Sequence, residues 1–424
     1  MERIEVLIAG AGVIGSAIAC ALVERGVRDV CVADLDLSGR YASSELNAGG
    51  ARATWWQEVN IAACRDSLAF FAEHAAEFSF RRTGYLWLYA DAGLWERARA
   101  VRALQERLGV SVETLAPGDV TRRFPVVDRA LEELVGATFS PGDGLLNPNA
   151  LRRWYQERAT AGGARFLRSH YLDELELAET APGTRRVVRA DFTEVQKPGA
   201  GDEGRLYERI LTQNGVPAEA ALGQHAFEPK IFVNALGAWS PTVSARLGVP
   251  SQSQPVRRQI AIVDVRSHDL PRAVDLHALP MIVDASGLYF HPEGPYTLVG
   301  YSNPEEPAGY RFDYDGDDFF EREIWPRLAH RASAFERAHH VRGWAGLYAV
   351  TPDCSGILGR VAGTSNAIEA HSFTGRGVMQ SRAIGRGVAE LICDGRYSAL
   401  DLSPLSPARF ARPREEWLQE DLHI

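Results

Sequence analysis

The sequence is poor in cysteine, and the few cysteines it has form no recognisable pattern. They occur five times in 424 residues without a C-x-x-C pair, at Cys20, Cys31, Cys64, Cys354 and Cys393. An odd, scattered set argues against a disulfide framework and against a zinc site. We therefore expect no bound metal and a reducing, cytoplasmic location.

Tracts of a single charge are also missing. Acidic and basic residues are mixed along the chain and give a net charge of −9. Because nucleic-acid-binding proteins carry a basic stripe or arm, we expect no nucleic-acid partner. The first residues, MERIEV, lack the basic region and cleavage site of a signal peptide.

Only one hydrophobic run is long enough to suggest a membrane span. Eighteen residues from Val6 to Val23 carry no charge, which is the lower limit for a transmembrane helix. The run divides, however, into a short β-rich part and a part with helical periodicity that closes at Gly26. We therefore expect a strand and a helix here, with no transmembrane segment.

The sequence does contain a βαβ pattern at its start. The segment RIEVLIAG predicts a strand, VIGSAIACALVERG a helix and VRDVCVADLD a second strand. Helical periodicity also covers residues 60–77 and 94–108, with strand-like RRTGYLWLYAD between them, and a further helix is expected after an N-cap at Asn147 or Asn149. Residues 175–228 predict a polar, peripheral β-region with a loop or insertion, and residues 256–300 an antiparallel sheet.

Three glycines and one acid form the most specific motif. Gly10, Gly12 and Gly15 stand in G-x-G-x-x-G spacing between the first predicted strand and helix. Gly10 permits a tight turn, Gly12 lets backbone N–H groups approach a pyrophosphate, and Gly15 lets the helix pack close to the strand. Asp34, at the end of the second strand, lies where a carboxylate binds ribose hydroxyls, with Asp36 as the second choice.

This pattern predicts a dinucleotide site rather than a structural turn, but it is common to NAD and FAD proteins. A nicotinamide enzyme would continue with further βαβ units. This sequence turns instead to ASSELNAGGARA and ends on a second glycine-rich turn before a helix.

These segments resemble the D-amino acid oxidase / sarcosine oxidase superfamily of FAD-dependent oxidoreductases. IAGAGVIGSAIA, ASSELNAGGAR, VNALGAWS, GWAGLYAVTPDCSGILG and FTGRGVMQSRAIGRGVAELI follow the family's order over almost the whole chain. The resemblance is strongest to the sarcosine and dimethylglycine dehydrogenase branch and to sarcosine oxidase β subunits. It implies an α/β fold in which a Rossmann-like FAD-binding domain is interleaved with an α+β substrate domain built on an antiparallel sheet.

The resemblance also implies which residues hold FAD. The serines 43 and 44 would hydrogen-bond the pyrophosphate or flavin, side chains at glycines 49 and 50 would collide with the flavin ring, and the arginine at 376 would stabilise the reduced flavin, unless it points to solvent. The residues expected at the cofactor are Gly10, Gly12, Val13, Ile14, Gly15, Asp34, Ser43, Ser44, Asn47, Gly49, Gly50, Ala235, Gly237, Gly375, Arg376, Gly377, Val378 and Met379. The attachment cysteine of monomeric sarcosine oxidases aligns with Gly346, and ELNAGG lacks the attachment histidine of dimethylglycine dehydrogenases. We therefore expect non-covalent FAD.

The substrate residues are less completely matched. Arg52 aligns with an arginine that faces the substrate carboxylate in sarcosine oxidase relatives, its alternative being a surface ion pair. A second carboxylate-binding lysine aligns with Met379, and glycine oxidase has an arginine where this chain has Tyr348. The substrate is then held by Arg52 with Tyr348, or by Arg258, or it lacks an α-carboxylate. His291 is either an active-site base or hydrogen-bond donor or a structural residue.

We expect different roles for the two tryptophans that follow Arg52. We expect at least one of Trp55 and Trp56 in the core, and the other as a pocket wall or a stacking partner for a cationic amine. The lysine linked to oxygen activation in monomeric sarcosine oxidase aligns near Leu298, which weakens the case for a fast oxidase. The electron acceptor is expected to be O2 or a carrier protein or quinone.

Together these features predict the domains and the reaction. The FAD-binding domain is expected to comprise residues 1–80, 145–250 and 340–400, the substrate domain residues 81–144 and 251–339, and a peripheral tail residues 401–424. The predicted reaction is oxidation of a C–N bond in a secondary or tertiary amine or an amino acid derivative, with hydride transfer to flavin N5. The alternatives are oxidation of a 2-hydroxy acid and an FAD-binding assembly protein with little turnover.

Overall fold

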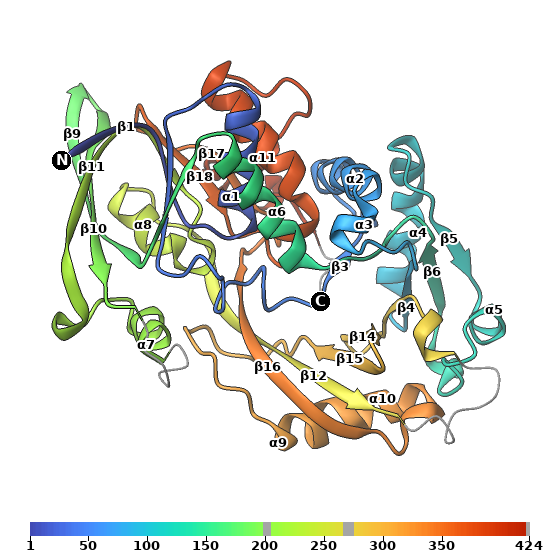
Figure 1. Ribbon diagram of the computed structural model, residues 1–424. Helices are drawn as coiled ribbons and strands as arrows, with labels where there is room; N and C mark the ends of the chain where they lie inside the picture. The colour runs from blue at the N-terminus through green and yellow to red at the C-terminus, as the bar shows by residue number, and fades with distance from the viewer. Residues whose placement is uncertain (198–204, 266–274, 421–424) are drawn as a thin grey trace.

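The computed structural model describes residues 1–197, 205–265 and 275–420. Two large sheets and the helices that cover them make up most of the chain (Figure 1). The chain passes between the sheets several times, so each sheet is built from segments that lie far apart in the sequence.

The first sheet is largely parallel. Its strand order is β17 (Ile357–Arg360), β18 (Ala367–His371), β11 (Ala221–Asn234), β1 (Glu2–Ala9), β2 (Val30–Asp34) and β8 (Arg165–Arg168). The strands β8, β2, β1, β11 and β18 are parallel, and β17 is antiparallel to β18. A hairpin of β9 (His170–Ala181) and β10 (Thr184–Val195) pairs antiparallel with β11.

Both faces of this sheet are covered, as a parallel sheet requires. The helices α1 (Val13–Glu24), α2 (Glu58–Glu73), α6 (Pro148–Ala161) and α11 (Gly377–Cys393) pack together over one face (Figure 1). The β9–β10 hairpin and α8 (Ser240–Arg246) bury apolar residues against the other face. Of the two predicted N-caps of α6, Asn147 and Asn149, the structure has Asn147, whose side chain accepts hydrogen bonds from the backbone N–H groups of Asn149 and Ala150.

The second sheet is antiparallel except for one pair. Its order is β16 (His339–Val350), β12 (Gln254–Asp264), β15 (Tyr296–Tyr301), β14 (Leu288–Glu293), β13 (Met281–Val283), β4 (Tyr85–Tyr89), β6 (Gly136–Ser140) and β5 (Glu113–Leu115), with β13 and β4 parallel. The predicted α/β fold class, with a mixed parallel sheet and a mainly antiparallel second sheet, is confirmed. Because β16 pairs with β12, this sheet extends past the limit expected at residue 339.

Shorter elements complete the fold. A two-stranded ribbon joins β3 (Gly50–Ala51) to β7 (Gly144–Leu145). The segment α9 (Asp317–Phe319), a π-helical turn (Phe320–Ile324) and α10 (Trp325–Arg331) pack their apolar side chains with those of the second sheet. The remaining helices are α3 (Ala75–Phe78), α4 (Ala92–Arg107), α5 (Pro117–Arg123) and α7 (Arg205–Gln213).

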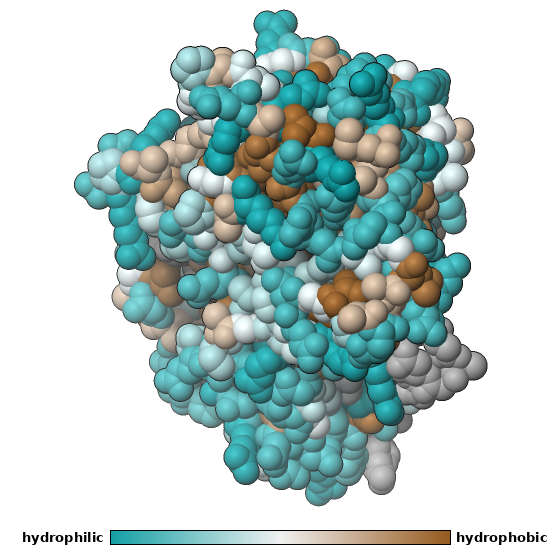
Figure 2. All heavy atoms as spheres, turned by 90° about the vertical axis from the view of Figure 1, so that its left-hand side faces the viewer, coloured by the Kyte–Doolittle hydropathy of each residue, from teal (hydrophilic) through white to brown (hydrophobic). Residues whose placement is uncertain are grey.

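The polar region 175–228 forms the β9–β10 hairpin, α7 and the start of β11, and its residues 198–204 lie outside the described part of the chain. From the side that carries β9 and β10, the surface is mostly hydrophilic, and its apolar residues form separate patches (Figure 2). Among the described residues, no helix is long and apolar enough to cross a membrane. The uncharged run at the start of the chain forms β1 and α1, as predicted.

One loop of the second sheet reaches the first. Residues 302–316 extend from β15 towards α8, where Tyr310 and Phe312 stack on Trp239 with ring centroids 5.7 and 6.1 Å away. Arg257, on β12, ties this loop down through ion pairs with three carboxylates of the loop, those of Glu306, Asp313 and Asp315. Segments that follow strands of the two sheets thereby meet beside Trp239.

The C-terminal segment differs from the peripheral tail expected from its proline and charge content. Leu402 and Leu405 are fully buried in the main core. The Glu420 carboxylate, 1% exposed, accepts hydrogen bonds from the backbone N–H groups of Trp56 and Gln57 and from the Asn60 side chain. Residues 401–420 therefore belong to the packed structure, and residues 421–424 lie outside the described part.

Candidate active site

The glycine motif forms a turn from β1 into α1. Gly10 has a φ of +105°, and a Cβ there would lie 2.4 Å from the carbonyl oxygen of Ala235. A Cβ at Gly15 would lie 1.9 Å from the Gly10 oxygen, so this glycine lets the helix pack on the turn. A Cβ at Gly12 would meet only Ser44 Oγ, at 3.8 Å, because this position faces a cavity. The three glycines thus have the separate geometries that the motif predicts.

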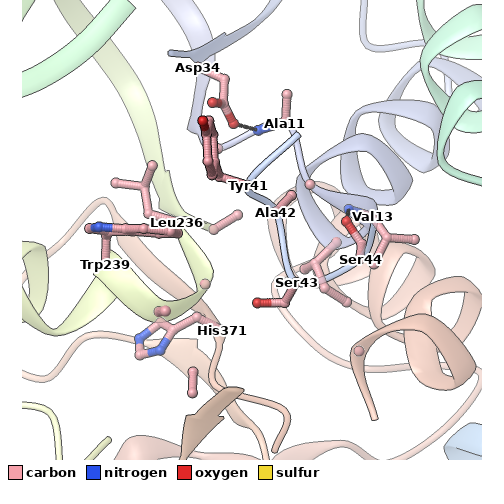
Figure 3. A pocket seen from close by; sticks show the side chains of 18 of the residues that line it. Ala11, Val13, Asp34, Tyr41, Ala42, Ser43, Ser44, Leu236, Trp239 and His371 are labelled. Atoms are coloured by element: carbon pink, nitrogen blue, oxygen red, sulfur yellow. Dashed lines mark hydrogen bonds between the residues drawn. The ribbon is translucent and has the colours of Figure 1, made fainter. Parts of the chain in front are cut away.

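Asp34 lines the same cavity, with its carboxylate beside Ala11 (Figure 3). Its carboxylate accepts hydrogen bonds from the backbone N–H groups of Ala11, at 2.6 Å, and Asp36, at 3.0 Å. Burial raises the pKa of this carboxyl. Asp36, the second choice, also lines the cavity, and its carboxylate accepts hydrogen bonds from Ser38 and Arg40 of its own loop.

The loop after β2 closes another side of the cavity. Ser43 donates to the Leu347 carbonyl at 2.5 Å. Ser44 Oγ accepts from the Val13 N–H at 3.4 Å, and the two residues lie side by side in Figure 3. An ion pair between Glu45 and Arg152 of α6, which leaves the arginine side chain only 3% exposed, anchors this loop. The loop is thereby held over the N-terminus of α1.

Most of the predicted cofactor residues meet at this large cavity. Those that line it are Gly10, Gly12, Val13, Ile14, Asp34, Ser43, Ser44, Asn47, Ala235, Gly237, Gly375, Gly377 and Val378. Two helices, α1 and α11, begin beside it, and neither has a side-chain N-cap. Uncapped helix N-termini bind anions through their backbone N–H groups. The space at Gly12, the Asp34 carboxylate and these helix ends fit FAD, with its diphosphate near α1.

The two glycines of NAGG are constrained by the protein itself, and their expected closeness to the flavin ring stays a prediction. Gly49 has a φ of +72°, and a Cβ there would lie 2.5 Å from the Leu146 carbonyl oxygen. A Cβ at Gly50 would lie 1.8 Å from the Tyr85 hydroxyl. Gly49 lines neither cavity described here, and Gly50 lines the smaller one.

A small cavity adjoins the large one. The two share Asn47, Tyr348, Thr374, Gly375 and Val378. Its remaining lining residues are Ala48, Gly50, Arg52, Trp55, Tyr85, Met281, Tyr289 and Met379. Because the second sheet supplies Tyr85, Met281 and Tyr289, the small cavity lies between this sheet and the proposed cofactor space and is a candidate substrate site.

Arg52 is the one cationic side chain among these lining residues. It is 5% exposed, and its guanidinium carbon lies 4.2 Å from the ring centroid of Trp55, 4.9 Å from Trp87 and 5.2 Å from Tyr85. In the described part of the chain it forms no ion pair, and its Nε has no hydrogen-bond partner. The alternative of a surface ion pair is therefore wrong for Arg52. A buried arginine without a carboxylate partner favours an anionic ligand.

Both tryptophans are buried, and Trp55 also lines the small cavity. The guanidinium of Arg376 lies 4.1 Å from the Trp55 ring and donates to the Cys354 carbonyl. Arg376 is fully buried and lines neither cavity, so its side chain neither reaches solvent nor faces the cofactor space as expected. Its contact with Trp55 and its carbonyl partner account for the difference. Burial lowers the pKa of this guanidinium.

The structure places His291 away from the chemistry expected of it. Its Nδ1 lies 2.8 Å from the Pro292 carbonyl oxygen and its Nε2 2.8 Å from that of Ala48. The ring is 2% exposed and lines neither cavity, and burial lowers its pKa to about 4. His291 is therefore a structural residue that supports the NAGG segment, and its candidacy as a base is wrong.

Of the other residues considered for substrate binding, some line the cavities and one does not. Tyr348 lies where the two cavities meet, and Met379 lines the small one. Arg258 lies behind Tyr348, 5.6 Å from its ring centroid, and lines neither cavity.

Several cavity residues carried no sequence signal. Tyr41, Trp239 and His371 line the large cavity, and Tyr85 and Tyr289 the small one. None belongs to a spaced motif, because each is brought in by pairing or packing between distant segments. Trp239 alone stood within a quoted family segment, VNALGAWS.

Comparison with known proteins agrees with this geometry. The family model described as FAD dependent oxidoreductase matches residues 5–391, and the chain belongs to this family. FAD-dependent oxidoreductase domain-containing protein 1 of Xenopus laevis is 29% identical over 99% of this chain and 84% of the relative. Mitochondrial dimethylglycine dehydrogenase of Homo sapiens is 22% identical over 97% of this chain and 45% of its own length.

Solved structures share the fold. L-proline dehydrogenase from P. horikoshii superposes with a TM-score of 0.77 at 22% identity, covering 99% of this chain and 100% of that one. Glycine oxidase from Geobacillus kaustophilus gives 0.73 at 21% identity, covering 96% and 99%. The protein is therefore an FAD-dependent oxidoreductase of a family whose members include amino acid oxidases and dehydrogenases.

Proposed function

We propose that the protein oxidises the C–N bond of a small amino acid derivative, with a secondary or tertiary amine as the preferred class. The observation that carries this proposal is Arg52, a buried cation without an ion pair in the described part of the chain, in a cavity that adjoins the proposed FAD site. The guanidinium would bind the substrate carboxylate and so direct the α-carbon towards the shared wall of the two cavities.

The neutral lining supports an amine in its uncharged form. Apart from Arg52, the small cavity is lined by aromatic, hydroxyl, amide and apolar residues and by glycine, with no acidic side chain among the described ones. Burial raises the pKa of Tyr85 to about 12, so its phenol remains protonated. FAD, when bound, supplies the acceptor for the two electrons and the α-hydrogen of the substrate.

A 2-hydroxy acid is the second candidate. Its oxidation needs a base for the hydroxyl proton, and among the described residues the small cavity is lined by no histidine, carboxylate or lysine. An assembly protein with little turnover would not need a buried, unpaired cation beside the cofactor. Both alternatives therefore rank below amine oxidation.

We further propose that FAD is bound without a covalent link, that the protein acts in the cytoplasm, and that O2, a carrier protein or a quinone reoxidises it. No cysteine in the described part of the chain lines either cavity. Gly346 takes the place of the attachment cysteine of monomeric sarcosine oxidases. A Cβ there would lie 2.9 Å from the Leu46 Cβ, so this position is packed against the loop that follows β2.

The test is anaerobic reduction of the bound flavin by a panel of amino acids, N-alkyl amino acids, simple amines and 2-hydroxy acids. We expect bleaching by N-substituted amino acids and release of FAD from the denatured protein. Reduction by hydroxy acids alone would reject the amine proposal, and flavin that stays with the precipitated chain would reject non-covalent binding. Failure of every compound would favour the assembly protein.

A further inference from the structure

The backbone on both sides of Arg52 is held by three consecutive residues. Before Arg52, β3 pairs with β7, matching Gly50 with Leu145 and Ala51 with Gly144. After it, the buried carboxylate of Asp143 accepts hydrogen bonds from the Ala53 N–H at 2.8 Å and from Thr54 Oγ1 at 2.5 Å. Arg52 therefore lies between two anchors that residues 143–145 supply.

The Arg52 side chain depends on these anchors. Its described contacts are with Trp55, Trp87 and Tyr85, whose ring faces attract a cation without fixing the direction of its N–H groups, and with the Tyr85 hydroxyl. A bidentate carboxylate would fix that direction, but none is present among the described side chains. The position of the backbone therefore contributes to where the guanidinium points.

Asp143 also places a negative charge behind the anion site. Burial raises the pKa of its carboxyl to about 6, against the opposing effects of Thr54, Ala53, Ser140 and the Arg52 cation. The other ionisable groups that sense it are Tyr85 and Cys64, and burial raises the pKa of each to about 12. Asp143 is therefore the member of this group that changes charge near neutral pH.

We propose that Asp143 is a positioning residue for Arg52 and sets how tightly Arg52 binds a carboxylate. This inference rests on the proposed function. The hydrogen bonds of Asp143 hold the Arg52 segment in place, whereas its charge opposes the incoming anion. The two effects are separable, because asparagine keeps acceptor and donor atoms in place without the charge, and alanine removes both.

The experiment titrates FAD-loaded protein with acetate and with benzoate between pH 5 and pH 8, following the flavin absorbance. We expect wild type to bind each carboxylate about threefold more tightly below the Asp143 transition than above it. Asp143→Asn should bind tightly across the range, without that transition. Asp143→Ala should weaken binding about tenfold, because small displacements of a binding group are costly. FAD affinity should be unchanged in both variants.

Asp128 provides a matched control. Its carboxylate accepts the same kinds of hydrogen bond, from the N–H and Oγ of Ser333, in a different part of the molecule. Asp128→Asn and Asp128→Ala should alter thermal stability without changing carboxylate affinity or its pH profile. A purely structural role for Asp143 would make its variants behave in the same way.

The outcomes separate this inference from the proposed function. If Arg52→Ala binds carboxylates as wild type does, or wild type binds none, the anion site is not at Arg52 and both proposals are wrong. If Arg52→Ala loses binding but Asp143→Asn keeps the wild-type pH profile, the inference about Asp143 is wrong and the proposed function stands. The asparagine variant decides the question even if Asp143→Ala does not fold.

Discussion

The three glycines of the turn between β1 and α1 have different structural roles. A side chain at Gly10 or Gly15 would strike backbone, whereas one at Gly12 would enter the cavity. Adding a side chain at Gly10 or Gly15 should therefore impair folding, whereas adding one at Gly12 should impair cofactor binding.

Gly12→Val should fold but bind FAD at least about a hundredfold more weakly, because its isopropyl group occupies the space of the diphosphate. Gly15→Ala should instead lower the folding yield, because its Cβ meets the Gly10 carbonyl. Flavin content and thermal unfolding of the apoprotein measure the two effects. Equal flavin retention by wild type and Gly12→Val would contradict the assignment of the cavity.

Arg52→Ala should raise the KM for a carboxylate substrate roughly ten- to a hundredfold while FAD stays bound, because a charge-assisted hydrogen bond contributes about 1.5–3 kcal/mol. Arg52→Lys should recover part of the loss, since an ammonium lacks the guanidinium fork. Arg99, exposed and paired with Glu96, is the control for removing an arginine. Unchanged steady-state kinetics in Arg52→Ala would redirect the search to Tyr348 and Arg258.

His291 predicts a pH dependence of stability. Burial lowers its pKa from 6.5 to about 4, so between these values the unfolded chain binds a proton that the folded protein does not. The free energy of unfolding should therefore fall as pH drops through this window, by about 3 kcal/mol at its lower end. Asp143, with its raised pKa, contributes the opposite slope.

The prediction is tested by urea unfolding of wild type and His291→Gln at each pH. Asp143 contributes equally to the stability of both proteins, so its effect cancels in the difference between them. The difference in unfolding free energy between the two proteins should change with pH. A constant difference from pH 7 to pH 4 would show that the ring has the same pKa in the folded and unfolded states, and so that burial does not lower it.

At the scale of elements, α2 begins without a cap of its own. Its N-cap residue, Gln57, makes no side-chain hydrogen bond to the helix, and Glu420 from the end of the described chain accepts from this helix start instead. The carboxylate also lies at the positive end of the helix dipole. A distant segment thus completes a local structure.

Glu420→Ala should lower the free energy of unfolding by about 1.5–3 kcal/mol, the contribution of hydrogen bonds to a buried charge. Glu420→Gln should lose less, because it keeps one acceptor. The control is Glu416→Ala, an exposed acid of the same segment. Equal thermal unfolding of the two alanine variants would mean that the Glu420 contacts add nothing.

The sequence predicts those parts of the structure that depend on residues close together in the chain. The turn at Gly10–Gly15 and the helix cap at Asn147 depend on neighbours in the chain and were predictable. The cap from Glu420, the contact of Arg376 with Trp55 and the contact of His291 with Ala48 each depend on a partner hundreds of residues away. Composition alone made residues 401–420 look peripheral, because the buried side chains among them are few.

At the scale of the whole molecule, the loop 302–316 links the two sheets beside the FAD cavity. Trp239 lines that cavity, and Tyr310 and Phe312 stack against it. Arg257, which is 5% exposed, holds the loop through ion pairs with the loop carboxylates of Glu306 and Asp315. Loss of this arginine would leave like charges close together and release the loop.

Arg257→Met should therefore speed FAD release about tenfold, because the wall at Trp239 loses its support. The rise of free flavin fluorescence after dilution measures the rate. Arg311→Met removes an exposed partner of Asp313 and should change the rate little. Equal release rates for these two variants would show that the loop does not contribute to cofactor retention.

The FAD cavity also sets when the cofactor can enter during synthesis. Its walls come from residues near both ends of the chain, from the Gly10 turn to the Gly375–Val378 turn. A ribosome makes the first turn early and the last one only after most of the chain has emerged, although N-terminal parts fold first. The full cavity therefore forms only after residues 375–378 have been made, so FAD binds a chain in which every strand of both sheets is already present.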